Sequence, residues 1–261
     1  MISNITRTFS SKLYGELSSL RSFFVYLPKY KLSTLVEPKQ EISHDDLKKI
    51  DPDPLNHPDF FHVYNMFTIK DLFDAKVHFG HKEGSLNDHM RPFIFGSRLG
   101  HLIIDLDKSA ELLRQALNFT AHIAFKDGII LFIAKNPQIS YLVENTAKEC
   151  QEYAHTRKWN LGTFTNAVQE FGVVTRLPDL CIFLNTMESV VKQHTAVVHA
   201  AKMCIPSIGI VDTNCDPKLI TYPVPGNDDT PCAIELYCKL FKNAIIKGKK
   251  YRKEMLAKNE A

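Results

Sequence analysis

The sequence lacks several patterns that would identify an enzyme or a membrane protein. No apolar run approaches the ~20 residues that a membrane-spanning helix needs. There is no Gly-x-Gly-x-x-Gly pattern, no Walker loop and no Gly-x-Ser-x-Gly nucleophile turn. The 6 cysteines include no Cys-x-x-Cys pair, which favours free thiols in a reducing compartment over a disulfide framework or a zinc site. The formal net charge is only +3, so any affinity for nucleic acid must come from local groups of basic residues.

Acidic residues are almost missing from the first 36 residues, where Glu16 is the only one. Serines are frequent there, apolar residues recur at helical spacing, and the basic residues are Arg7, Lys12, Arg21, Lys29 and Lys31. An Arg- and Ser-rich, acid-poor, amphipathic segment is typical of a mitochondrial transit peptide, although a basic disordered arm has a similar composition. We expect residues 1–36 to be a targeting leader that directs the chain to the mitochondrial matrix.

The rest of the chain divides by composition. Residues 37–66 are acidic and contain four prolines, which predicts an extended arm and not core. Residues 67–246 carry the regular apolar pattern of a folded domain, and residues 247–261 form a basic tail.

Strands and helices are expected to alternate within the domain. Thr68 is placed to cap a short helix, and two apolar segments at 93–96 and 101–106 suggest a β-hairpin or two short strands. The later helices are expected at 107–126, 137–153, 188–203 and 228–250, and the strands at 129–134, 180–184, 207–211 and 222–224. This alternation predicts a doubly wound, Rossmann-like α/β domain of three layers with a mostly parallel sheet.

The candidate catalytic residues have simpler structural interpretations. The turn after the first strand, Lys135–Gln138, has no glycine with which to cradle a phosphate. Asp212 follows a strand where an active-site carboxylate could stand, but no histidine or second acid is paired with it in the sequence, so turn chemistry is favoured. His78 and His81 resemble a metal-ligand pair, but Gly80 interrupts them and no third ligand is evident. We expect no metal and no cofactor, with His81 bonded to backbone or RNA.

Basic residues offer a different kind of site. Arginine and lysine contact phosphate oxygens, and an aromatic ring can stack on an unpaired base. The alternative for each residue is a solvated helix end or loop. The expected RNA-binding set is Lys82, Arg91, Arg98, Lys135, Arg157, Lys158, Trp159, Lys249, Lys250 and Arg252.

Seven motifs of the domain resemble the universal second protein of the small ribosomal subunit, the "S-two" family. They stand in the family's order, and they are VHFGH (77–81), NDHMRPFIFG (87–96), HLIIDLDK (101–108), KWNLGTFTN (158–166), RLPDLCIFLN (176–185), IPSIGIVDTNCDP (205–217) and YPVPGNDD (222–229). The resemblance implies a structural, non-enzymatic ribosomal protein that contacts small-subunit rRNA and neighbouring ribosomal proteins, with no membrane and no homo-oligomer.

Departures from the family pattern point to a mitochondrial member, from an animal. Bacterial members carry a long helical hairpin where only Ala167–Arg176 stands here, so contacts made through that hairpin do not transfer. Gly84 and Leu86 stand where an arginine and an aromatic are usual, and Leu161 replaces a usual glycine. Two other functions remain open at this stage. One is a nucleotide-binding enzyme that uses Asp212, and the other is a protein-only scaffold that recruits partners through residues 37–66.

Overall fold

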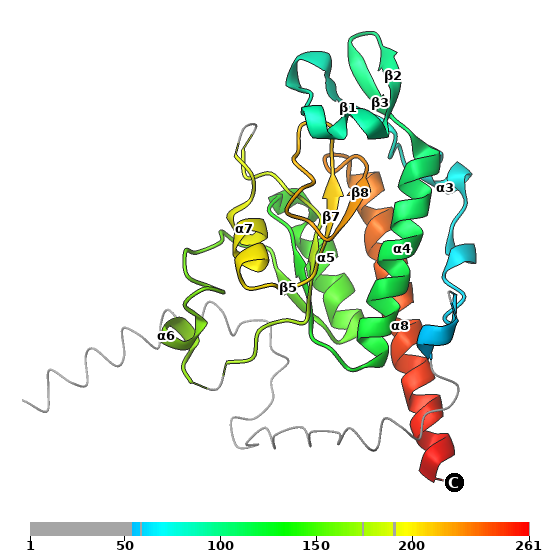
Figure 1. Cartoon of the computed structure of the whole chain (residues 1–261), viewed down its shortest axis with the longest axis vertical. Coiled ribbons are helices and arrows are strands. Elements are labelled where there is room, and N and C mark those ends of the chain that lie inside the picture. The colour runs from blue at the N-terminus through cyan, green and yellow to red at the C-terminus, as the bar shows by residue number, and fades with distance from the viewer. Residues whose placement is uncertain (1–53, 58, 174, 190–191, 261) are drawn as a thin grey trace, which may run out of the picture. The chain divides into compact units, whose positions relative to one another are not determined.

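The computed structural model describes residues 54–57, 59–173, 175–189 and 192–260. The expected leader and residues 37–53 of the expected arm lie outside these residues. The described part is an α/β structure in which a parallel sheet lies between helices (Figure 1). None of its helices combines the length and the apolar character that a membrane span requires.

The central sheet has five strands in the order β5-β4-β6-β7-β8, and each adjacent pair is parallel. The strands are β4 Ile130–Ile133, β5 Tyr153–His155, β6 Leu180–Phe183, β7 Ser207–Val211 and β8 Tyr222–Pro225. Within this sheet β4 comes first in the chain. Strand β5 lies on one side of it, and β6, β7 and β8 follow in order on the other side. This is the flavodoxin-type order of a doubly wound sheet. The predicted fold class is confirmed.

Two apolar cores lie on the two faces of this sheet. Every residue of β6 is buried, and its side chains alternate between the cores. Leu180 and Ile182 belong to the larger core, whereas Cys181 and Phe183 belong to the smaller one. A strand covered on both faces must be apolar throughout, which explains the uninterrupted run in the sequence.

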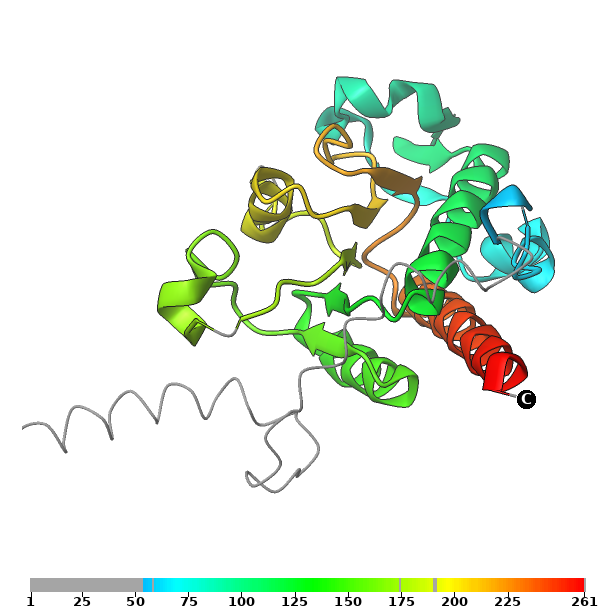
Figure 2. The same ribbon diagram turned by 60° about the horizontal axis from the view of Figure 1, so that its bottom comes forward.

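Helices from both halves of the domain cover these cores. The larger core is closed by α4 (Leu106–Phe125), α5 (Pro137–Cys150) and α8 (Pro231–Glu260). Helices α4 and α8 run side by side (Figures 1 and 2). The smaller core is closed by α7 (Thr195–Lys202), which lies across the sheet from α4 and α8 (Figure 1). A short helix, α6 (Ala167–Phe171), stands where the bacterial hairpin was expected to be missing.

Side-chain caps fix where several helices begin. The Asp105 carboxylate accepts a hydrogen bond from the Asp107 N–H before α4, and the Asn136 side chain accepts one from the Gln138 N–H before α5. Thr68 and Asp71 form a reciprocal capping box at α3 (Ile69–Asp74), as the sequence predicted.

A second, smaller sheet packs beside the carboxyl ends of the parallel strands. It contains β1 (Phe79–Lys82), β2 (Ile94–Arg98) and β3 (His101–Ile104) in the antiparallel order β1-β3-β2. Strands β2 and β3 confirm the predicted hairpin, whereas β1 was not predicted. Short 3-10 turns complete the described chain at η1 Pro54–Asn56, η2 Tyr64–Met66, η3 Glu83–Ser85 and η4 Asp88–Phe93.

Two helix boundaries inside the domain differ from the prediction by several residues, and β5 was not predicted. The helix expected at 188–203 begins only at Thr195, because a β-bridge between Met187 and Gln193 closes a turn first. The helix expected at 137–153 stops at Cys150, since Gln151 takes a left-handed conformation and the chain enters β5. Both errors arose where an apolar pattern continues past a turn that contains neither glycine nor proline.

The compact body also extends further at both ends than the composition indicated. Phe61 and Val63 are fully buried in the larger core, although they belong to the expected arm. Helix α8 continues to Glu260, so the basic segment after residue 246 is helical and partly packed.

Candidate polar cluster and nucleic-acid interface

A polar cluster lies at the carboxyl ends of β7 and β8, where the small sheet meets the large one. Asp212 follows β7 and is 1% exposed, and Asp229 follows β8. His81 of β1 places its Nδ1 3.0 Å from Asp212 Oδ2 and its Nε2 3.5 Å from Asp229 Oδ2. The sequence argument found no partner for Asp212, and this was wrong: His81, distant in the chain, is that partner.

Local hydrogen bonds fix the cluster. The Thr213 hydroxyl accepts from the His81 N–H at 2.9 Å, and the Thr213 carbonyl accepts from the Asn87 N–H at 2.9 Å. A Cβ atom at Gly80 would stand 2.5 Å from Thr213 Cγ2, so only glycine lets the two segments approach this closely. The Asp-Thr-Asn turn is therefore structural, as predicted, and it also holds the histidine in place.

The cluster is rich in negative charge. Asp228 is 6% exposed and neighbours Asp229, and burial together with the charges of Asp212 and Asp229 raises its pKa to about 8. The hydrogen bond to Asp212 raises the pKa of His81 to about 9 despite partial burial. At neutral pH the His81 imidazolium thus lies between Asp212 and Asp229, next to the Asp228 carboxyl group, whose ionisation is disfavoured by burial.

Three of the expected RNA-binding residues lie on or beside the small sheet and are exposed. Lys82 of β1 and Arg98 of β2 are both register partners of His101, which lies on the central strand β3. Residues opposite one another in adjacent strands present their side chains on the same face. Lys82, His101 and Arg98 therefore form a row across the sheet, which we call the basic row. Arg91 is 70% exposed and pairs with Asp88 at 2.8 Å.

The basic row had one member that the sequence argument missed. His101 is exposed and lies between the two cations, but in the sequence it reads as the first residue of an apolar strand. The periodicity of the hairpin could have revealed it, because Arg98 and His101 flank a two-residue turn.

Lys135, Arg157 and Lys158 are exposed near the carboxyl ends of β4 and β5. Trp159, expected to stack on a base, is instead 8% exposed and lies in the smaller core. Its indole N–H donates to His199 Nδ1 at 3.2 Å. The prediction for Trp159 is wrong in this structure, because its ring fills the space beside α7.

Two of the three C-terminal residues of the set are engaged inside the protein. The Lys249 ammonium pairs with the buried Glu152 carboxylate and donates to the Cys150 carbonyl at 2.7 Å. Arg252, with 19% of its side chain exposed, donates to the Phe125 carbonyl at 3.0 Å. Lys250 has 73% of its side chain exposed. The expectation of RNA contact is corrected for Lys249 and Arg252, which join α8 to the rest of the fold.

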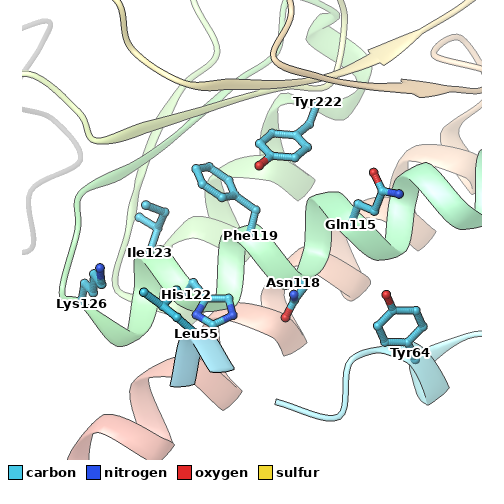
Figure 3. A pocket seen from close by; sticks show the side chains of 9 residues that line it. All are labelled: Leu55, Tyr64, Gln115, Asn118, Phe119, His122, Ile123, Lys126 and Tyr222. Carbon is cyan, nitrogen blue, oxygen red and sulfur yellow. The ribbon is translucent and has the colours of Figure 1, made fainter. Parts of the chain in front are cut away.

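A pocket of about 410 Å³ lies elsewhere, along the outer side of α4 (Figure 3). Phe119 of α4 stacks on Tyr222 at its inner side, with ring centroids 4.7 Å apart, and Leu55 and Tyr64 lie on its opposite wall. Tyr222 begins β8, so this pocket is not at the carboxyl ends of the strands, where doubly wound folds bind nucleotides.

Comparison with known proteins gives the family. The model of the family described as ribosomal protein S2 matches residues 72–172 and 168–248. The small ribosomal subunit protein uS2m of Bos taurus is 52% identical over 85% of this chain and 75% of its own length. The uS2 proteins of Caulobacter vibrioides and of Nitratiruptor are 34% and 33% identical over 70% and 75% of this chain, and over 82% and 88% of their own lengths.

The alignments also locate the missing insertion. The Caulobacter alignment spans 224 positions but includes only 70% of the 261 residues here, so some positions of the relative have no counterpart. The family match divides at residues 168–172, within the segment where the hairpin was expected to be absent. Over most of its length, and with the expected fold, this chain belongs to the ribosomal protein S2 family, a family of structural and non-enzymatic proteins.

Proposed function

We propose that the chain is a structural constituent of the mitochondrial small ribosomal subunit, where it binds small-subunit rRNA and neighbouring ribosomal proteins. The observation that carries this proposal is the 52% identity to a uS2m protein over most of the chain. In this function the protein does no chemistry. It offers a rigid α/β body whose surface charges and apolar side chains meet RNA and protein.

The basic row is the strongest candidate for phosphate contact. Lys82 and Arg98 are exposed, and the structure gives no ion pair for either among the described residues. An arginine and a lysine on adjacent strands can neutralise neighbouring phosphates of an RNA backbone. Arg91, Lys135, Arg157, Lys158 and Lys250 are exposed as well, and we assign them a supporting role in the same contact.

The hairpin that carries Arg98 also supports contact with a neighbour. Phe95 is 81% exposed and Leu99 is 94% exposed, and both belong to the β2–β3 segment. Large apolar side chains this exposed on one projecting hairpin are typical of a surface that is covered in an assembly. A hairpin with apolar and basic residues suits a junction of RNA and protein.

We also propose that residues 1–36 are the targeting leader, that the part of the expected 37–66 arm ahead of the buried Phe61 is extended, and that the matrix is the site of action. The composition of the leader supports this, and a mitochondrial relative agrees with it. The chain acts as a single copy in each subunit, because RNA and other proteins supply its interfaces.

The test is binding of the full chain to small-subunit rRNA transcribed in vitro, measured at several salt concentrations. The double variant Lys82→Gln/Arg98→Gln should bind more weakly, and its slope of log affinity against log salt should fall by roughly 1.5. The control is Lys126→Gln/Lys239→Gln, which removes two exposed lysines outside the expected set. Equal salt slopes for the two double variants would refute the assignment of the basic row. A wild-type chain that never sediments with small subunits in organelle extracts would refute the function itself.

A further inference from the structure

We propose that the pocket on the outer side of α4 binds an adenosine moiety, which is held by ring stacking and by side-chain amides (Figure 3). The pocket volume of about 410 Å³ lies within the range of ~300–1,000 Å³ that is usual for sites of small organic ligands. The same moiety occurs in an unpaired adenosine of an RNA strand and in a free adenine nucleotide.

One stripe of α4 forms the floor of the pocket. Its residues stand at positions i, i+3, i+4, i+7 and i+8 of the helix, and they are Gln115, Asn118, Phe119, His122 and Ile123. Residues at this spacing project from one side of a helix. All five are at least partly exposed, whereas the residues between them are buried in the larger core. This side of α4 is therefore accessible to a ligand.

The opposite wall comes from the segment that precedes α3. It consists of Leu55 in η1 and Tyr64 in η2, which are 65% and 41% exposed. Between them in the chain, Phe61 and Val63 are fully buried in the larger core. These two residues anchor the segment, so the wall has a fixed position before any ligand binds.

The pocket offers aromatic rings from both walls. Phe119 stacks on Tyr222, with ring centroids 4.7 Å apart and ring planes inclined by 29°, and Tyr64 stands on the other wall (Figure 3). A flat base can lie against Phe119 with Tyr64 on its other side. Stacking of a base on an aromatic side chain contributes roughly five- to a hundredfold in affinity.

Two amides on the floor select the base. Gln115 and Asn118 line the pocket on the same stripe as Phe119. An asparagine or glutamine amide matches adenine, because it can accept from the adenine amino group and donate to the neighbouring ring nitrogen. The Gln115 amide and the hydroxyls of Tyr64 and Tyr222 make no hydrogen bond to any described residue, so they are available to a ligand.

The pocket has little with which to hold a phosphate. Its lining contains no glycine and one lysine, Lys126, which is seven residues beyond Phe119 and about 10 Å further along the helix axis. A single exposed lysine adds little to the affinity for an anion. The nucleoside and not the phosphate should therefore determine binding, in contrast to the cleft of doubly wound nucleotide-binding folds.

The experiment is titration of the full chain with adenosine, followed by saturation-transfer NMR of the ligand, with guanosine, cytidine and uridine in parallel. We expect saturable binding of adenosine, and binding of the other three weaker by roughly fivefold or more, because the amides match adenine. AMP should bind within about twofold of adenosine, since the lone lysine contributes little.

Two variants remove the proposed contacts. Tyr64→Leu deletes one stacking wall and should weaken adenosine binding by roughly fivefold or more. Gln115→Leu deletes an amide and should reduce the preference for adenosine over guanosine. Both residues are exposed, so the fold should remain intact, which circular dichroism checks. The matched control is Lys126→Gln, which changes a lining residue outside the stack and should leave adenosine binding unchanged.

Single-stranded hexaadenylate separates the two sources of the ligand. If it competes with adenosine in a manner that needs Tyr64, the pocket takes an unpaired nucleotide of RNA, and if it does not compete, the pocket takes a free nucleotide.

Three results would overturn the proposal. They are the absence of saturable adenosine binding, equal affinity for all four nucleosides, and adenosine binding that neither Tyr64→Leu nor Gln115→Leu alters. Saturation by N-acetylleucine amide in place of adenosine would instead identify a docking site for an apolar side chain of a neighbouring protein. The isolated chain is used throughout, so no outcome depends on whether the chain enters a ribosomal subunit.

Discussion

Residues of one type have different roles in this protein because their surroundings differ. Lys249 and Lys250 are neighbours on α8, yet Lys249 pairs with buried Glu152 whereas Lys250 is largely exposed. From the sequence alone, both lysines were expected to offer their positive charge to RNA. Lys250 pairs with the exposed Glu254 carboxylate at 3.7 Å, a surface contact that it can give up for a phosphate at little cost. Separating Lys249 from Glu152 would instead leave a buried carboxylate unpaired.

His194 shows how burial makes a single residue sensitive to pH. It is 4% exposed, and its Nδ1 accepts a hydrogen bond from the Ala196 N–H, so that a histidine caps α7. Burial lowers its pKa to about 4, and protonation would destroy the acceptor.

We predict that His194 makes the protein less stable in mild acid. As pH falls below the ordinary pKa of 6.5, the unfolded chain takes up a proton that the folded chain refuses until about pH 4. The free energy of unfolding should therefore fall by up to about 1.4 kcal/mol per pH unit in that window because of this residue. Urea unfolding at pH 7.5, 6.5, 5.5 and 4.5 measures it.

The control for this prediction is His194→Asn, which keeps a capping oxygen and has no titration. Its free energy of unfolding should fall less steeply than that of the wild type between pH 6.5 and 4. Some slope should remain, because burial also lowers the pKa values of His155 and His199. Identical slopes in the two proteins would contradict the assignment.

At the scale of elements, the contact between α4 and α8 decides how closely the larger core can be closed. Gly248 of α8 lies against α4, and a Cβ atom there would stand 2.5 Å from the Ala121 carbonyl oxygen and 3.0 Å from the Ala124 Cβ. The sequence shows this glycine only as a weak point in a helix. The packing shows that the small residue permits the close approach of two helices.

We predict that Gly248→Ala destabilises the protein by about 1–3 kcal/mol, because the helices must separate to admit a methyl group. Helix propensity alone predicts the opposite sign, a gain of about 1 kcal/mol. Gly84→Ala is the matched control, since a Cβ atom there meets nothing within 4 Å. Thermal unfolding of both variants gives the comparison, and a more stable Gly248→Ala protein would show that the helices do not approach as closely as described.

At the scale of the whole molecule, the chain combines the S2 domain with a basic, acid-poor N-terminal segment. The S2 body accounts for most of residues 72–248, and the basic, acid-poor segment stands before it. The body supplies the surfaces for assembly, and we assign delivery to the leading segment.

We predict that residues 1–36, fused ahead of a fluorescent reporter, are sufficient for import into mitochondria. The variant Arg7→Glu/Lys12→Glu/Arg21→Glu should leave the reporter in the cytosol, because it removes the positive charge that the membrane potential draws inward. Replacing serines of the same segment by alanine should preserve import and serves as the control. Microscopy and protease protection measure the result, and import of the glutamate variant would contradict the prediction.

The sequence by itself determined the fold class and most of the strands and helices, but it did not show β1, β5 or α6. Strands buried on both faces leave continuous apolar runs, as at β6 and β7, and helices leave their caps and stripes. These signals are local, so they can be read without knowing what lies nearby. The S2 motifs were equally visible, because each is a short run of adjacent residues.

Only the tertiary structure decided which side chains meet. It brought His81 to Asp212, placed His101 between Lys82 and Arg98, buried Trp159, and engaged Lys249 and Arg252 inside the fold. The physical reason is that burial and pairing depend on segments far apart in the chain. The charge that a residue can present to RNA is therefore settled by packing, whereas its place in a helix or strand is settled mainly by its neighbours in sequence.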